Sequence, residues 1–146
     1  MIRYTTSLDG IDEADLDGFF VGWPNPPSPA LHRRILRGSA ALVLAWDDAA
    51  ADDPAGRVVG FITAISDGVL AASLPLLEVL PSYQGRGIGT ELVRRMLAEL
   101  DDRYMVDLTC DQDLVPFYER LGLVRADAMS IRRPEAIGEQ ERGSSA

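Results

Sequence analysis

The sequence has very little of the chemistry that builds disulfides and metal sites. It holds one cysteine, Cys110, and one histidine, His32, among 146 residues. A single cysteine cannot form an intrachain disulfide, which is typical of a reducing compartment, and we therefore expect a cytoplasmic protein. One histidine and one cysteine are also too few for a His/Cys metal site, so no metal cofactor is expected.

Long apolar runs and positive charge are scarce as well. No stretch reaches the roughly 18 consecutive apolar residues of a membrane span, and the first residues, MIRYTTSLDGIDEADL, lack the apolar core of a signal peptide. Lysine and arginine total 14 against 23 aspartates and glutamates, a net charge of -9. Nucleic-acid binding needs a basic face. We therefore expect neither nucleic acid nor membrane as a partner, and an acidic surface favours cationic ones such as amines.

What is present fits one globular domain. Hydrophobic residues make up 47% of the chain and charged residues 25%, which are ordinary values for a domain with a buried core. We expect a single domain over residues 1–134. The polar residues 135–146 are expected to form a disordered tail.

Apolar periodicity and turn residues predict a mixed α/β fold. The predicted strands are residues 3–6, 39–48, 57–66, 73–81, 103–110 and 123–133, and the predicted helices are 11–21, 29–38, 88–100 and 111–122. A proline-rich loop, GWPNPPSP, separates the first two helices, and Ser28 is the expected N-cap of the second. This order departs from strict βαβ alternation and indicates a mixed sheet.

Three glycines stand at alternate positions between a predicted strand and a predicted helix. They are Gly85, Gly87 and Gly89. A strand that opens into a helix at such a turn presents unpaired backbone N–H groups at the positive end of the helix dipole. Arg86 can add a charge-assisted hydrogen bond from its side chain. The pattern predicts an anion-binding turn, and the alternative is a tight packing turn between strand and helix.

The type of anion can be narrowed from the neighbouring residues. No lysine follows the glycines, which excludes a P-loop. Gly85 and Gly87 match the first glycines of a dinucleotide motif, but Thr90 replaces the third, and Asp107 stands about where a ribose-binding acid would lie. An NAD-dependent oxidoreductase is therefore a remote alternative, because three predicted strands precede the turn and the order does not suit a doubly wound domain.

The segment QGRGIG, residues 84–89, resembles the Q/R-x-x-G-x-G/A acetyl-CoA signature of the GNAT superfamily of N-acetyltransferases. Downstream, PFYERLGL resembles the F-Y-x-x-x-G-F segment of the same superfamily, and together the two cover residues 76–123. The resemblance implies a central, mostly antiparallel sheet that splays between its fourth and fifth strands, with about four helices. It also implies acetyl-CoA as cosubstrate, and homodimers occur in the family.

The resemblance assigns the pyrophosphate of the cosubstrate to the backbone amides of the glycine turn and the pantetheine arm to the fourth strand. Asp111 stands where the family often has asparagine, and an ionised aspartate can only accept a hydrogen bond from that arm. The implied cofactor-binding residues are Leu77, Val79, Leu80, Gln84, Gly85, Arg86, Gly87, Ile88, Gly89, Thr90 and Asp111.

The implied reaction is direct attack by a primary amine of a small molecule or peptide on acetyl-CoA, in a ternary complex. Tyr118 matches the tyrosine to which the family assigns the general acid. An amine with a pKa near 10.4 must first lose a proton. Glu78, a lone carboxylate in an apolar strand, is the candidate base, since desolvation would raise its pKa. An ordered water as base, an ammonium anchor and an ion pair remain the alternatives for this position.

The acceptor is not specified by the sequence. The proline-rich loop supplies Trp23 and Asn25, which are candidate acceptor contacts, and Asp107 and Asp67 are weaker candidates. A non-catalytic acyl-CoA-sensing domain is the alternative to an enzyme. Tyr118 argues against that alternative, because a sensor has no need of a general acid.

Overall fold

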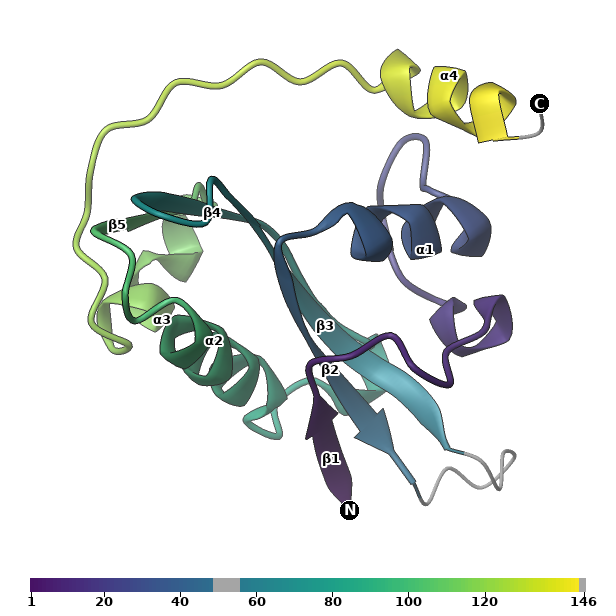
Figure 1. Ribbon diagram of the computed structural model, residues 1–146, viewed down its shortest axis with the longest axis horizontal. Helices are drawn as coiled ribbons and strands as arrows, with labels where there is room; N and C mark the ends of the chain where they lie inside the picture. The colour runs from purple at the N-terminus through teal and green to yellow at the C-terminus, as the bar shows by residue number, and fades with distance from the viewer. Residues whose placement is uncertain (49–55, 145–146) are drawn as a thin grey trace.

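The computed structural model describes residues 1–48 and 56–144, and its centre is one five-stranded sheet (Figure 1). The strands lie in the order β1-β2-β3-β4-β5, with β4 and β5 parallel and the other neighbours antiparallel. Their bounds are Ile2–Thr5, Ala41–Asp47, Arg57–Ser66, Ala71–Val79 and Met105–Asp107. This mixed, mostly antiparallel sheet confirms the fold class expected from the sequence.

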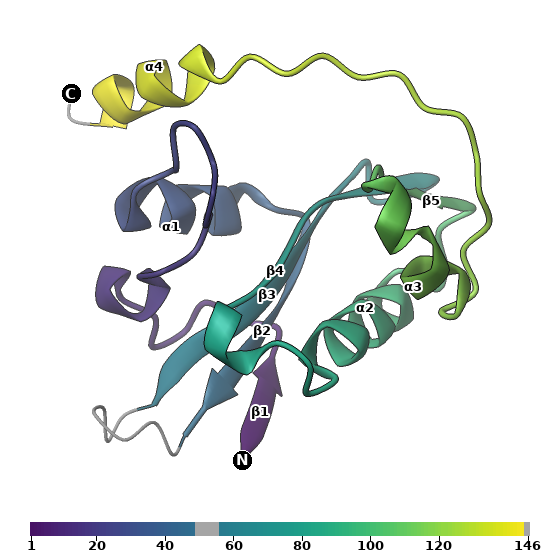
Figure 2. The same ribbon diagram turned by 180° about the vertical axis from the view of Figure 1, so that it is seen from behind.

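Helices cover both faces of the sheet. Helices α1 and α4 lie on one face, and α2 and α3 lie on the other, as Figure 2 shows from behind. The α-helices of the described residues are α1 (Pro29–Gly38), α2 (Ile88–Glu99), α3 (Val115–Glu119) and α4 (Glu135–Ser144), and the short 3-10 helices are η1 (Glu13–Leu16), η2 (Pro81–Tyr83) and η3 (Gln112–Leu114). None of the helices in these ranges is long and apolar enough to cross a membrane.

The sheet splays between β4 and β5, as expected. Residues Ala71–Ser73 pair with Met105–Asp107, and the ladder ends there, although β4 continues to Val79. The far half of β4 therefore keeps its β3 neighbour, and none of the described residues forms a strand on its other side.

Helix α2 packs closely on β2 and β3. Its buried residues follow the helical repeat of one apolar face: Ile88, Leu92, Val93 and Met96. Gly60 in β3 lets this helix approach, because a Cβ there would lie 3.1 Å from Leu92 Cδ1 and 3.2 Å from the backbone oxygen of Glu78. Substituting this glycine would push the helix off the sheet.

On the other face, the core is an aromatic cluster around His32. The His32 ring, in α1, is fully buried, with its centroid 4.3 Å from Phe61, 4.9 Å from Phe20 and 5.5 Å from Phe19. Neither ring nitrogen has a hydrogen-bond partner among the described residues. Burial lowers the pKa of His32 to about 4, so the ring is neutral at physiological pH.

The predicted helix over residues 29–38 is confirmed, including its start. The Ser28 hydroxyl accepts a hydrogen bond from the Leu31 amide at 3.1 Å, and Pro29 occupies the first turn. The predicted helix over 88–100 is confirmed as α2, and the one over 111–122 is divided into η3 and α3.

The predicted helix over residues 11–21 is wrong. Only Glu13–Leu16 is helical, as a 3-10 turn capped by Asp12. Gly18 and Phe20 then take the left-handed conformation, with φ of 90° and 62°. The Phe20 amide donates to the Glu78 carboxylate at 2.8 Å instead of to a helical carbonyl. A tertiary partner has replaced the helix that local periodicity predicted.

The predicted last strand, residues 123–133, is also wrong, and the expected disordered tail is replaced by a helix. Residues 123–133 are extended but join no sheet, and α4 follows them over residues 135–144. Helix α4 packs on α1, where the Glu141 carboxylate accepts hydrogen bonds from the Ser28 amide and hydroxyl, both at 2.8 Å. Residues 145–146 of the expected tail lie outside the described residues.

Candidate active site

The glycine turn leads directly into α2. Gly87 is the N-cap of the helix with φ of 81°, and Gly85 has φ of 78°. A Cβ at either position would meet nothing within 4 Å, so glycine is needed here for the backbone conformation. The first amides of a helix have no partner within it. Those of Ile88, Gly89 and Thr90 therefore form a cradle suited to an anion.

One side chain of the turn bonds to the sheet, and another packs on the 3-10 helix before the turn. The Gln84 side-chain amide donates to the Val79 carbonyl at 3.2 Å. The Arg86 guanidinium lies over the Tyr83 ring, 4.8 Å from its centroid, and donates to the Ser82 carbonyl at 3.4 Å. Arg86 thus reaches the outer side of the turn, where it can add charge to an anion on the cradle.

A cavity of about 490 Å³ lies beside the splayed strands, and we call it the wedge cavity. Strand β4 contributes its wall on one side, the segment after β5 and α3 contribute the other, and the chain after α3 contributes two residues. Its lining residues are Trp23, Ile62, Leu74, Pro75, Leu77, Leu108, Thr109, Cys110, Asp111, Leu114, Tyr118, Ser130 and Arg132. Four residues predicted for the site, Trp23, Leu77, Asp111 and Tyr118, therefore meet at one cavity.

Tyr118 is half-buried at the wedge cavity, with its ring packed edge-on against Phe117 at 4.9 Å. Burial, and secondarily the Cys110 thiol, raises the pKa of the Tyr118 hydroxyl above its usual value. The hydroxyl is therefore protonated at neutral pH, as a proton donor must be. Cys110 is exposed and lies in the same cavity.

Glu78 lies on the opposite face of β4 from Leu77, because successive side chains of a strand alternate. Its Oε1 accepts the Phe20 amide, and its buried Oε2 has no hydrogen-bond partner among the described residues. Burial raises the pKa of this carboxyl, and the hydrogen bond from Phe20 opposes that shift. Glu78 does not line the wedge cavity. Phe20, whose amide donates to Glu78, lines a second cavity on the other side of β4.

The second cavity measures about 400 Å³ and lies between α1, β4 and α4, and we call it the apolar cavity. Its lining residues are Phe20, Trp23, Pro27, Leu31, Arg34, Ile35, Leu76, Ala136, Ile137 and Gln140. Leu76 faces this cavity while its neighbour Leu77 faces the wedge cavity, and Trp23 lines both. The two cavities therefore adjoin at the Trp23 side chain, across the free edge of β4.

Several residues predicted for the site lie outside both cavities. Asn25 donates to the Pro134 carbonyl at 3.3 Å, and Asp107 is an exposed β5 residue paired in register with Ser73. Asp67 accepts three backbone amides of the β3–β4 turn, which lowers its pKa and marks it as a turn residue. Leu80 is buried, with its amide bonded to the Val59 carbonyl.

Sequence reasoning missed the contributions of the C-terminal segment. Ser130 and Arg132 line the wedge cavity, and Ile137 and Gln140 line the apolar cavity. The available signal for a helix there was composition, because residues 135–142, EAIGEQER, are mostly strong helix formers. Which surface such a helix would cover could not be read from that composition.

Comparison with known proteins identifies relatives over most of the chain. The model of the acetyltransferase (GNAT) family matches residues 8–123. The crystal structure of a candidate acetyltransferase from Deinococcus radiodurans is 55% identical, with a TM-score of 0.85 over 92% of this chain and 90% of that one. A GNAT family acetyltransferase from Streptococcus pneumoniae is 28% identical, with a TM-score of 0.69 over 91% and 99% of the two chains.

Curated relatives include a chloroplastic protein of Oryza sativa subsp. japonica named serotonin N-acetyltransferase 2. It is 34% identical over 120 residues, which are 80% of this chain and 58% of that protein. The chain spans about half the length of several such relatives.

Proposed function

Because the chain belongs to the GNAT acetyltransferase family, we propose that it transfers the acetyl group of acetyl-CoA to a primary amine. The observation that carries this proposal is the wedge cavity, which places Tyr118 beside the unpaired half of β4. The cavity lies between strands that separate only after Ser73, on a sheet that also carries the glycine turn.

The residues of this site fit acetyl-CoA. The amides at the start of α2 and the Arg86 guanidinium suit a pyrophosphate, since both offer donors and positive potential. The unpaired half of β4 offers backbone groups to an extended, amide-containing arm, with Leu77 as the neighbouring wall. Bound acetyl-CoA would supply an acetyl group activated as a thioester.

The proposed reaction requires proton transfer at two atoms, the nitrogen of the amine and the leaving sulfur. The incoming ammonium gives up one proton, and its neutral nitrogen attacks the thioester carbonyl carbon to form the new C–N bond. Glu78 is the proposed acceptor of that proton, through a water, because its Oε2 is buried without a partner and its pKa is raised. As the C–S bond breaks, the Tyr118 hydroxyl gives its proton to the leaving sulfur, and the second proton lost by the attacking nitrogen restores that hydroxyl.

The acceptor proposed here is a small molecule with a compact apolar body. The walls of the apolar cavity are mostly aromatic and aliphatic, and α4 closes one side of it. The cavity volume of about 400 Å³ is at the scale of a small-ligand pocket. The name of the rice relative, a serotonin N-acetyltransferase, supports an aromatic amine as the first compound to test. A peptide amine would need an open groove in place of this wall.

Donor binding is tested by thermal unfolding with acetyl-CoA, CoA, NAD and ATP. A ligand at about a hundred times its dissociation constant stabilises by about 2.7 kcal/mol, which raises the melting temperature by several degrees. We expect a shift with acetyl-CoA and CoA only. Acetyl-CoA should also slow alkylation of Cys110, the sole thiol, which lines the wedge cavity. A shift with NAD alone would favour the oxidoreductase, and no shift with any ligand would refute the site.

Catalysis is tested with Tyr118→Phe and Glu78→Gln. Each should lower kcat by about 10²–10⁴-fold, the usual contribution of a general acid or base, while keeping the stabilisation by acetyl-CoA. Tyr104→Phe is the matched control, because Tyr104 is exposed and lines neither cavity. Wild-type turnover in Tyr118→Phe would contradict the acid assignment. Binding of acetyl-CoA without turnover of any amine by the wild type would favour the sensing domain.

A further inference from the structure

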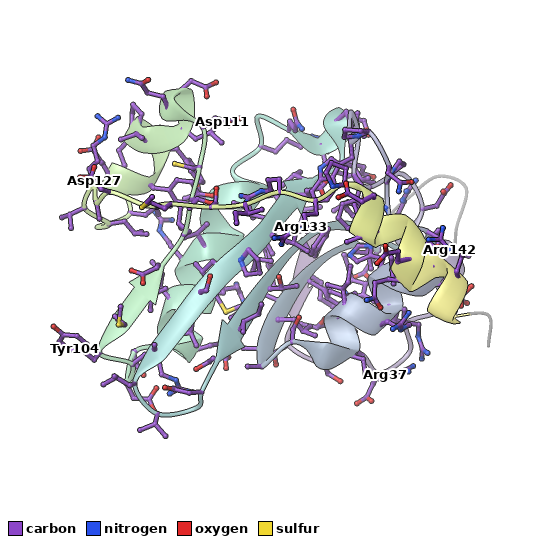
Figure 3. The ribbon with its side chains drawn as sticks, turned by 90° about the horizontal axis from the view of Figure 1, so that it is seen from above. Arg37, Tyr104, Asp111, Asp127, Arg133 and Arg142 are labelled. Carbon is purple, nitrogen blue, oxygen red and sulfur yellow. The ribbon has the colours of Figure 1, made fainter. Side chains whose placement is uncertain are left out.

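Arg132 brings a positive charge to the wedge cavity from the extended residues 123–133. This segment leaves α3, arcs over the end of the sheet and continues to α4 (Figures 1 and 3). Ser130 and Arg132 line the wedge cavity. Their neighbours Met129 and Ile131 point outward, with 100% and 72% of their surface exposed. Because successive side chains of an extended segment point to opposite sides, this segment presents a serine and an arginine to the proposed reaction site.

The Arg132 guanidinium is only partly hydrogen-bonded. It has five N–H donors, and it makes one long hydrogen bond, to Thr109 Oγ1 at 3.4 Å. No carboxylate of the described residues forms an ion pair with it. Arg34, which lines the apolar cavity, differs, because its guanidinium donates to the carbonyl and side-chain oxygens of Gln140 and so holds α4. A ligand in the wedge cavity can therefore use the remaining Arg132 donors.

Asp111 is the other charged residue among the described residues that line the wedge cavity. Its side chain does not cap the η3 helix that follows it, and it forms no ion pair with Arg132. Two opposite charges thus face one cavity without neutralising each other. This arrangement is complementary to a ligand that carries both an ammonium and a carboxylate. A simple amine would leave Arg132 uncompensated and would meet its like charge, which selects against that ligand.

We propose that the acceptor is an α-amino acid with an apolar side chain, and that Arg132 binds its carboxylate. The planar guanidinium matches a carboxylate with two parallel hydrogen bonds. Trp23 lines both cavities, so an apolar side chain can extend past it into the apolar cavity while the amino group stays beside Tyr118. This acceptor class rests on the proposed function, because it concerns the same site.

The carboxylate changes the charge of the acceptor and leaves the chemistry of transfer as described above. The amino nitrogen forms the new C–N bond, the C–S bond breaks, and the products are an N-acetyl amino acid and CoA. The proton that Glu78 takes from the ammonium passes to solvent. A simple amine is a cation, which the chain's net charge of -9 attracts, whereas an amino acid is neutral overall and is selected by contacts inside the cavity.

The test compares phenylalanine with phenethylamine, two acceptors that differ only in the carboxylate. Leucine and isopentylamine repeat the comparison for a smaller side chain. The value of kcat/KM for each is measured with saturating acetyl-CoA, in the full-length wild type and in Arg132→Gln. We expect the wild type to prefer the amino acid of a pair by at least about tenfold. In Arg132→Gln this ratio should fall by about 10- to 100-fold, as for the loss of a charge-assisted hydrogen bond, with the KM for acetyl-CoA unchanged.

Arg133→Gln is the matched control and should keep the wild-type ratio. Arg133 is adjacent in the chain and exposed, and it lines neither cavity (Figure 3). A loss of the ratio that is confined to Arg132→Gln therefore reports the cavity and not the general charge of the segment.

A binding measurement separates the carboxylate site from acetyl transfer. N-acetylphenylalanine and N-acetylphenethylamine lack the ammonium and differ only in the carboxylate, and each is titrated calorimetrically in the presence of CoA. We expect N-acetylphenylalanine to bind the wild type at least about tenfold more tightly, and this difference to disappear in Arg132→Gln. If neither amine of a pair is acetylated while this difference is present, acetyl transfer is refuted and the carboxylate site stands.

Four results would overturn the proposal. Turnover of the simple amines without preference for either amino acid would exclude the carboxylate site and leave the proposed function intact. A wild-type ratio in Arg132→Gln would assign the carboxylate to another group. A raised KM for acetyl-CoA with an unchanged ratio would place Arg132 on the donor. The absence of both turnover and carboxylate-dependent binding would overturn the acceptor class together with the proposed function.

Discussion

At the scale of single residues, His32 and Glu78 are ionisable groups in the core on the α1 face whose hydrogen bonding is incomplete. Both His32 ring nitrogens and one Glu78 carboxylate oxygen lack a hydrogen-bond partner among the described residues. Glu78 also holds Phe20 in its left-handed conformation through the Phe20 amide. A buried polar atom without a partner destabilises a fold, and such groups cluster at functional sites.

His32 predicts a loss of stability in acid. Its pKa is about 4 in the folded protein against 6.5 for the free side chain. The unfolded state therefore binds the extra proton first, and folding stability falls as pH decreases from 6.5 toward 4. The full effect is about 3 kcal/mol. His32→Leu should flatten the curve of unfolding free energy against pH in that window, measured by urea denaturation.

Glu78→Gln is the control for that experiment, because the Glu78 shift has the opposite sign. A carboxyl whose pKa is raised by folding makes the protein lose stability as pH rises above 4.5. A glutamine at this position can still accept the hydrogen bond from the Phe20 amide. The variant should therefore remove only the loss of stability above pH 4.5. If His32→Leu loses as much unfolding free energy between pH 6.5 and 4 as the wild type does, groups other than His32 cause the acid destabilisation.

At the scale of elements, α4 is held to the body mainly by polar contacts with the start of α1. Glu141 binds Ser28 twice, Arg34 donates to the Gln140 carbonyl at 3.2 Å, and Asn25 donates to the Pro134 carbonyl. The helix also supplies one wall of the apolar cavity through Ile137. Its docking therefore shapes the proposed acceptor site.

Glu141→Ala should release α4 without unfolding the domain. The variant loses two charge-assisted hydrogen bonds, each worth about 1.5–3 kcal/mol, while Ser28 still caps α1 through Leu31. We expect faster amide exchange in α4 and a higher KM for the amine, with the KM for acetyl-CoA unchanged. Glu139→Ala, an exposed position on the same helix, is the control and should change neither quantity. Unchanged exchange in Glu141→Ala would show that other contacts hold the helix.

At the scale of the whole molecule, the net charge of -9 acts oppositely on the two proposed substrates. A negative molecule attracts a cationic amine and repels the anionic donor over distances of about 10 Å at 0.1 M salt. At the proposed donor site, the α2 amides and Arg86 offer positive potential only locally.

Salt should therefore change the two specificity constants in opposite directions. Raising ionic strength should lower kcat/KM for the amine and raise or leave unchanged kcat/KM for acetyl-CoA, each measured with the other substrate saturating. Sucrose at matched osmolarity controls for effects that are not electrostatic. A parallel fall of both constants would show that local ion pairs dominate the approach of both substrates.

Local signals determined much of this protein from its sequence alone. Residues that interact with near neighbours behave as predicted: Ser28 caps α1, the α2 residues repeat at helical spacing, and Gly85 and Gly87 form a turn that opens α2. The order of the elements predicted the mixed sheet, and the resemblance of residues 76–123 to the GNAT superfamily implied its splay. These features depend on contacts within a few residues and on a resemblance in one continuous segment.

Only the tertiary structure decided the rest, because it depends on partners distant along the chain. The Phe20 amide, predicted to lie in a helix, instead donates a hydrogen bond to Glu78, 58 residues away. Residues 123–133 pair with no strand among the described residues, because pairing depends on where the folded chain carries a segment and not on its local pattern. Helix α4 forms against Ser28, 113 residues from Glu141, and closes the apolar cavity. Periodicity predicts which face of a segment is apolar, whereas packing decides what that face will meet.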